Sequence, residues 1–140
     1  KELLRTYYYN CLPYQGNPPT QDERNKFSNA QKFYRALERL PKYEVKQGKL
    51  EYRNGKYEQK RVDTLLSIDL VNLSASGKIS DAVLLAGDSD FIPAVKVAKD
   101  HGVNVILYHS KDKNNYHDAL WQTCDIRIPI TYDMVARIKR

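Results

Sequence analysis

The chain has 140 residues, a length typical of one domain with enough sequence to bury a proper core. Its hydrophobic fraction of 41% is ordinary, and its longest apolar run is far too short to span a bilayer, which argues for a soluble protein. There is no signal-peptide pattern, and Cys11 and Cys124 lie in no metal-ligand or disulfide-rich spacing. A reducing, cytoplasmic setting is expected, and pairing of the two cysteines stays open.

The net charge of +6 is distributed unevenly along the chain. Residues 1–61 carry 14 Lys and Arg against 7 Asp and Glu, whereas residues 62–140 carry 9 against 10, and all ten acids there are aspartates. The basic half also holds eight of the eleven tyrosines. Basic and aromatic side chains mixed in this way suit a polyanion with stackable bases. Composition alone leaves an idle solvated surface equally open.

The first elements in chain order are a strand and a helix. Arg5–Leu12 is rich in aromatic residues, as strands are, and a loop follows it to Pro19. Thr20 and Glu23 then form a capping-box pattern, which predicts a helix that ends near Leu40 because Pro41 stops it. Four basic residues fall together on one face of this helix, where they could contact a polyanion: Arg24, Lys32, Arg35 and Arg39.

A hairpin should follow, because Asn54-Gly55 is the strongest two-residue turn signal. It places Tyr52 opposite Tyr57 and Arg53 opposite Lys56. Like charges that face each other cost stability, so Arg53 and Lys56 are predicted to serve a ligand, although solvent screening makes an idle tip nearly as plausible. We assign residues 43–60 to a basic β-hairpin insertion.

The second half alternates strands and helices, which predicts an α/β domain. "AVLLA", Ala82–Ala86, is apolar at every position, as in a parallel strand covered on both faces. Pro129 has no amide hydrogen to donate to a neighbouring strand, so the last strand is expected at the edge of the sheet. The expected elements are helices at 62–73, 91–101, 116–122 and 132–138 and strands from Asp81, from Val103 and at 126–130.

Two aspartates, Asp88 and Asp90, follow the "AVLLA" strand directly, at the end where open α/β sheets place their sites. One of them could cap the next helix, but a single cap explains two aspartates poorly. Asp69 lies within the apolar stripe of the 62–73 helix and needs a partner, either a hydrogen-bond donor or a metal-linked group. Asp63, near the start of that helix, could simply be favoured there by the helix dipole. If its helix packs beside the strand, Asp63, Asp88 and Asp90 converge on one cation.

These residues resemble a known family. "KRVDTLLSIDL", Lys60–Leu70, and "SDAVLLAGDSDFIPAVKVAKDHGVNV", Ser80–Val105, look like the NYN (LabA-like) branch of the PIN-like nuclease superfamily. The resemblance implies a three-layer α/β/α PIN-like sandwich with a mostly parallel central sheet. It also implies metal-dependent endonucleolytic hydrolysis of RNA by Asp63, Asp88 and Asp90, with Asp69 and Lys60 in support. Residues 1–140 would form one such domain.

Two departures from the family pattern stand out. Arg61 replaces a glycine, and the family's first strand, which ends in an aspartate, has no counterpart here. We therefore expect an N-terminally incomplete domain whose metal site lacks one carboxylate. An RNA-binding domain with a degraded site stays an alternative on this ground. "GDSDFIPAVKVAKDHGV" also resembles the acidic motif of haloacid-dehalogenase-type phosphatases, but the nucleophile loop that those enzymes need is not in this chain.

The residue types fit a hard divalent cation, Mg²⁺ or Mn²⁺, which prefers oxygen ligands and is commonly held by a few carboxylates and the substrate phosphate. No serine, cysteine or histidine nucleophile is then required. The scattered histidines His101, His109 and His117 are taken as structural. The predicted partner is single-stranded or structured RNA, no membrane is expected, and a homodimer stays open.

Overall fold

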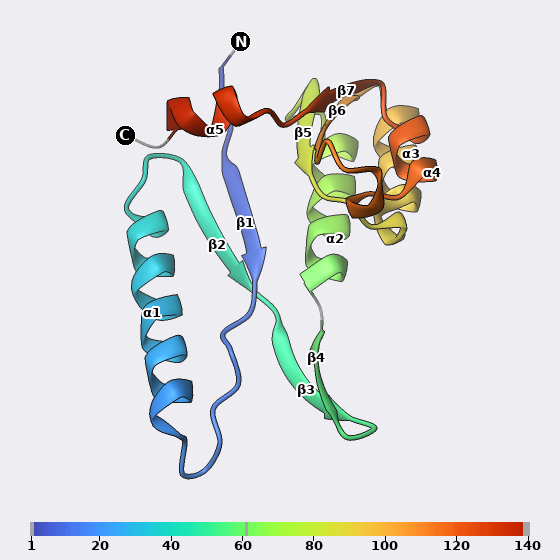
Figure 1. The fold of residues 1–140 in the computed structure, drawn as a ribbon. Helices are drawn as coiled ribbons and strands as arrows, with labels where there is room; N and C mark the ends of the chain where they lie inside the picture. Colours follow the sequence, from blue (N-terminus) through green and yellow to red (C-terminus); the bar gives the residue numbers. More distant parts are fainter. Residues whose placement is uncertain (1, 61, 139–140) are drawn as a thin grey trace. The chain divides into compact units, whose positions relative to one another are not determined.

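The structure, a computed structural model, describes residues 2–60 and 62–138, apart from the side chains of residues 51, 53, 57–60, 137 and 138. Strands and helices alternate along most of this chain (Figure 1). The chain divides into two compact units, Lys1–Leu66 and Ser67–Arg140. The division falls within α2 (Val62–Ala75), which is one uninterrupted helix. None of the described helices is both long and apolar enough to cross a bilayer.

The first unit begins with a parallel strand pair connected by a helix. β1 (Thr6–Asn10) pairs along its whole length with β2 (Tyr43–Gln47), and α1 (Gln21–Glu38) connects the two strands. Tyr34 of α1 is buried, and its hydroxyl donates a hydrogen bond to the Cys11 carbonyl at 3.0 Å. The aromatic side of α1 is thereby held against the strand pair.

The predicted start of α1 is confirmed. The Thr20 hydroxyl accepts a hydrogen bond from the Glu23 amide at 3.2 Å, and the Glu23 carboxylate accepts one from the Thr20 amide at 2.8 Å. This reciprocal pair satisfies two of the amide donors that a helix start leaves without partners. The helix ends at Glu38, two residues before the predicted end.

The hairpin is confirmed in its turn and register, but its start was wrong. β3 (Lys49–Arg53) and β4 (Lys56–Lys60) are antiparallel, and Arg53 lies opposite Lys56 as predicted. Asn54 and Gly55 both have positive φ, as this tight turn requires. Residues 43–47 do not belong to the insertion, because they form β2 and pair with β1. That pairing joins segments more than 30 residues apart, so no local turn signal reveals it.

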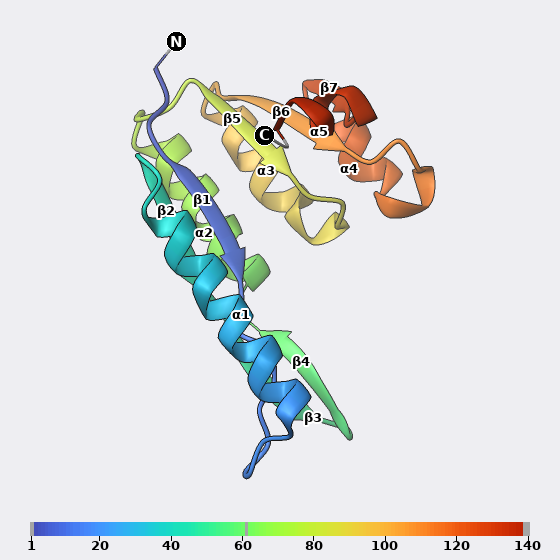
Figure 2. The same ribbon diagram turned by 60° about the vertical axis from the view of Figure 1, so that its left-hand side comes forward.

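The second unit contains a three-stranded parallel sheet in the order β5-β6-β7, with the middle strand β6 paired on both sides. Helix α3 packs on β6 and on α4, and the elements of this unit can be followed in Figure 2. The predicted helices and strands of this half are all present. Their bounds are β5 (Asp81–Leu85), η1 (Ser89–Phe91), α3 (Ile92–Asp100), β6 (Asn104–His109), η2 (Lys113–Asn115), α4 (Asp118–Thr123), β7 (Ile126–Pro129) and α5 (Tyr132–Ile138).

The expectation that the "AVLLA" strand is covered on both faces was wrong. Leu84 is 6% exposed, but its neighbours Val83 and Leu85 are 65% and 69% exposed. Successive side chains of a strand point to opposite faces, so the face of β5 that carries Leu84 is buried and the face that carries Val83 and Leu85 is open. Among the described residues β5 pairs with β6 alone, which makes it an edge strand. Because every residue of this strand is apolar, the sequence contains no sign that one face is buried and the other exposed.

The core of the second unit lies between the sheet and α3 and α4. Its fully buried side chains are Leu107, Leu120, Val95, Val105 and Cys124. Both cysteines of the chain are buried and free, which answers the question of pairing. Burial raises the pKa of the Cys11 and Cys124 thiols, so both are poor nucleophiles near neutral pH.

Candidate metal centre

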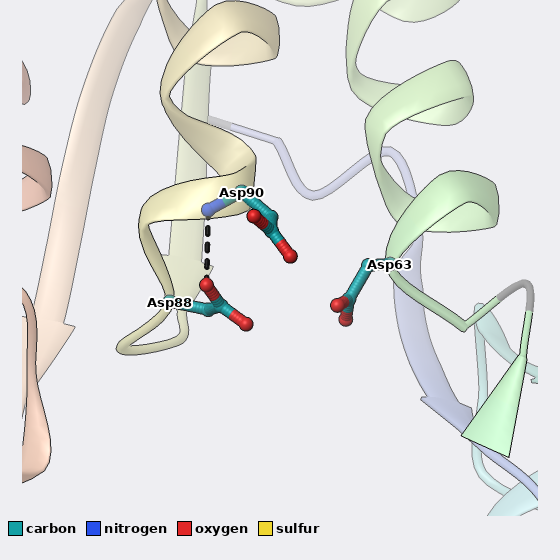
Figure 3. Close-up of side chains that lie close together, drawn as sticks. All are labelled: Asp63, Asp88 and Asp90. Carbon is teal, nitrogen blue, oxygen red and sulfur yellow. Dashed lines mark hydrogen bonds between the residues drawn. The ribbon is translucent and has the colours of Figure 1, made fainter. Parts of the chain in front are cut away.

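Asp88 follows the carboxyl end of β5 and begins the η1 turn. Its backbone is extended, with φ −87° and ψ 139°, and its Oδ1 atom accepts a hydrogen bond from the Asp90 amide at 3.0 Å (Figure 3). Asp88 is therefore a cap, as one of the sequence interpretations required. The cap uses one oxygen of the carboxylate and fixes the direction of the other.

Asp90 lies within η1, and capping does not explain it. Its side chain is exposed and accepts no hydrogen bond from any residue that the structure describes. The apolar residues around it, such as Phe91 and Ala94, are buried. The second aspartate of "GDSD" thus has no structural role within the described part of the chain.

Asp63 brings a third carboxylate to Asp88 and Asp90. It is exposed in the first turn of α2, and one ligand oxygen from each of the three residues lies within 4.8 Å of the others. Figure 3 shows the three carboxylates directed towards a common space. Negative groups so close together repel one another unless a cation or protons compensate their charge.

The donor set fits a hard divalent cation. All three ligands are carboxylate oxygens, the type that Mg²⁺ and Mn²⁺ prefer. Ligands on opposite sides of a Mg²⁺ ion lie about 4.2 Å apart, so oxygens within 4.8 Å need only small side-chain rotations to share one ion. Exposure leaves room for the waters that such ions retain.

The other predicted site residues lie apart from this cluster or beyond the described atoms. Asp69 is half-buried, interacts with another group and is not part of the three-carboxylate cluster. The side chains of Lys60 and Arg53 lie outside the described residues, as does Arg61. Lys56 is exposed at the hairpin turn. The four basic residues of the predicted helix face are exposed as well: Arg24, Lys32 and Arg35 in α1, and Arg39, its C-cap.

Sequence reasoning missed a cavity beside Asp88. Its volume is about 500 Å³, and it is lined by Gly87–Ser89 and by Asn114–His117 from the loop that follows β6. The signal was available, because the carboxyl ends of neighbouring parallel strands meet at one edge of a sheet. His117 Nδ1 accepts a hydrogen bond from the Ala119 amide at 3.2 Å and so caps α4.

Gly87 allows the two loops around this cavity to approach closely. The Gly87 carbonyl accepts a hydrogen bond from the His117 amide at 2.8 Å. A Cβ atom on residue 87 would clash with the Asn115 carbonyl oxygen and lie 3.3 Å from the Tyr116 Cα. Backbone atoms cannot give way as the end of a flexible side chain can.

We therefore predict that Gly87→Ala lowers the free energy of unfolding by about 1–3 kcal/mol, the usual cost of overpacking. Urea titration of the variant and the unchanged protein measures this difference. The control is Ala75→Ser, a small substitution at an exposed position of α2, which should change the free energy of unfolding little. Gly77→Ala is less suitable as a control, because the positive φ of residue 77 would strain an alanine there. Equal stability of Gly87→Ala and the unchanged protein would show that the loops do not meet in this way.

Comparison with known proteins places the chain in a family. The structure resembles the crystal structure of a protein of unknown function, VPA0982, from Vibrio parahaemolyticus, with a TM-score of 0.69, 16% identity and coverage of 94% of this chain and 72% of that one. This likeness concerns the fold. An uncharacterized protein, y4oD, from Sinorhizobium fredii is 42% identical over 59 residues, which are 42% of this chain and 28% of that protein's length.

The NYN domain family supplies the match that spans nearly the whole sequence. Its family model covers residues 2–131, so it includes both units and all three clustered aspartates. The parallel strands flanked by helices are those of an α/β fold, as the sequence predicted. The chain belongs to the NYN domain family.

Proposed function

We propose that this protein is a metal-dependent ribonuclease that hydrolyses phosphodiester bonds within RNA. The NYN domain implies a PIN-like nuclease fold, and the observation that carries the proposal is the clustering of Asp63, Asp88 and Asp90. In this proposal the three carboxylates hold Mg²⁺ or Mn²⁺ and are the catalytic residues. The NYN assignment also removes the reason to read "GDSD" as a phosphatase motif.

The divalent cation would supply a water of lowered pKa and would offset the negative charge that develops on the phosphate oxygens. The protein's own contribution is to preorganise the carboxylates. Asp88 is oriented by its hydrogen bond from the Asp90 amide, and Asp90 is carried on the same turn. Asp63 is carried in the first turn of α2. Preorganised charges cost no rearrangement during the reaction.

Supporting roles for two further residues are part of the proposal. Asp69 would help to hold α2 in place through its own interaction, and Lys60, the last residue of β4, would provide a positive charge near the substrate. Membership of the LabA-like branch, a single-domain organisation and a cytoplasmic location stay predictions from the sequence, and a homodimer stays open.

RNA is the proposed substrate because membership of the NYN family makes it plausible, and the basic face of α1 offers charge for its backbone. Phosphate contacts from Lys and Arg supply most of the non-specific affinity of such proteins. Lys56 at the hairpin turn is a second exposed cation in the first unit. Strand β1 adds aromatic surface. The ring centroids of Tyr7 and Tyr9 lie 6.2 Å apart, and the Lys46 ammonium nitrogen lies over the Tyr7 ring, 5.2 Å from its centroid.

Metal addition and removal test the proposal. Single-stranded RNA should be cut when Mn²⁺ or Mg²⁺ is present and should stay intact with EDTA. Because an ion that binds only the folded state stabilises it, the free energy of unfolding should rise by about 2.7 kcal/mol at an ion concentration roughly 100-fold above Kd. Gel analysis of labelled RNA and thermal melting measure the two effects.

Two outcomes would contradict the ribonuclease. RNA binding without cleavage in either metal would identify an RNA-binding domain instead. Cleavage that persists undiminished in EDTA would show that the carboxylates do not act through a divalent cation.

A further inference from the structure

The cavity beside Asp88 lies entirely within the second unit, between the loop after β5 and the loop after β6. Asp88 belongs both to the carboxylate cluster and to the wall of this cavity. A molecule bound in the cavity therefore lies next to the proposed metal centre. The cavity is a hollow that is wide open to solvent, and its volume of about 500 Å³ is enough for one nucleotide-sized group, since small-molecule sites span about 300–1,000 Å³.

The lining of the cavity is polar and aromatic but contains no Lys or Arg. The Asn114 side-chain amide is exposed and makes no hydrogen bond within the described part of the chain. The hydroxyl of half-buried Tyr116 has no partner there either. Since His117 Nδ1 accepts from the Ala119 amide, the neutral ring carries its proton on Nε2, which remains available as a donor.

Tyr116 is held from behind by a buried histidine. Its ring centroid lies 4.6 Å from that of His109, which is only 7% exposed. His109 Nδ1 bonds to the Ser110 carbonyl at 2.7 Å, and the Trp121 indole donates to His109 Nε2 at 3.3 Å. Both nitrogens of His109 are thereby used, and the tyrosine ring has a fixed support.

We infer that this cavity binds one nucleobase and its ribose from the RNA strand, next to the phosphate that is cut. The inference rests on the proposed function for the identity of the strand. Amide groups recognise the edges of unstacked bases, and aromatic rings stack on their faces. The absence of a cation from the lining argues against a phosphate as the occupant.

The test is a binding measurement in EDTA, so that it does not depend on cleavage. Single-stranded RNA oligonucleotides that carry one 2-aminopurine at successive positions are titrated with the protein. One position should show a fluorescence change on stacking. Asn114→Ala and Tyr116→Ala should abolish that change, and Tyr116→Ala should weaken binding about tenfold, the scale of one lost base–aromatic stack. Tyr116→Phe should keep the stacking signal.

Asn72→Ala is the matched control, because Asn72 is an exposed asparagine nine residues along α2 from Asp63 and so on the opposite side of that helix. It should bind like the unchanged protein. Thermal melting shows whether Tyr116→Ala is folded; if it is not, Asn114→Ala decides the matter.

The two proposals fail in different ways. Normal cleavage with unchanged 2-aminopurine signals in Asn114→Ala and Tyr116→Ala would overturn the base site alone. A position-specific signal that Asn114→Ala abolishes, together with no cleavage in any metal, would overturn the ribonuclease and leave the base site. No binding of RNA by the unchanged protein would overturn both.

Discussion

Replacement of Asp90 by asparagine should lower the rate of metal-dependent RNA cleavage by about 10² to 10⁴, the scale of losing a main electrostatic element of a site. Asparagine keeps the shape of the side chain but removes a charge that helps to hold the cation. Folding should survive or improve slightly, because repulsion among the three carboxylates falls. Single-turnover cleavage and thermal melting without metal measure the two effects.

Asp63→Asn should behave like Asp90→Asn, and Asp88 allows capping to be separated from metal binding. Asp88→Asn keeps an oxygen that can accept from the Asp90 amide, so it should lose activity while it remains stable. Asp88→Ala should lose activity and also about 1 kcal/mol of stability, since the cap is gone. Asp100→Asn, at an exposed position in the last turn of α3, is the control and should change neither quantity.

Normal cleavage by the asparagine variants, with early melting, would identify these aspartates as structural and remove the nuclease assignment from them. A result in which only Asp63→Asn is fully active would mean that the cation is held by Asp88 and Asp90 without α2.

Removal of the four charges on the basic face of α1 should weaken RNA binding and flatten its salt dependence. For single strands each lost phosphate contact reduces the steepness of log K against log salt by about 0.7. With four contacts removed, the slope of the combined variant should be less steep by up to about 3. The variant replaces each of four residues with glutamine: Arg24, Lys32, Arg35 and Arg39. Binding to labelled RNA at several salt concentrations in EDTA provides the slope.

Lys26→Gln is the control for this experiment. Lys26 is exposed on the same helix, but it lies about 200° around the axis from Arg24 and is 3.0 Å from the Asp22 carboxylate. Lys26→Gln should leave the slope of log K against log salt unchanged, because Lys26 lies away from the proposed RNA-binding face. If the combined variant and Lys56→Gln both keep the original slope, the basic half of the chain is a solvated surface only.

Much of the local structure was predictable because its causes are local. The Thr20–Glu23 capping box, the Asn54-Gly55 turn and the Asp88 cap each depend on residues within three positions of one another. The strand and helix order of the second half followed from periodicity for the same reason. The segments Lys60–Leu70 and Ser80–Val105 together also sufficed to name the NYN family that the comparison then established.

What the sequence determined by itself was therefore the set of elements, their caps and turns, and the identity of the three aspartates. Only the tertiary structure decided that residues 43–47 pair with β1, that one face of β5 is open, and that Asn114–His117 share a cavity with Asp88. Each of these depends on segments that are distant in the chain, and a short-range sequence pattern does not indicate which distant segment packs against a given strand or loop. The closeness of the three carboxylates is of the same kind, because charge repulsion by itself would separate them and no local pattern predicts that their ligand oxygens lie within 4.8 Å of one another.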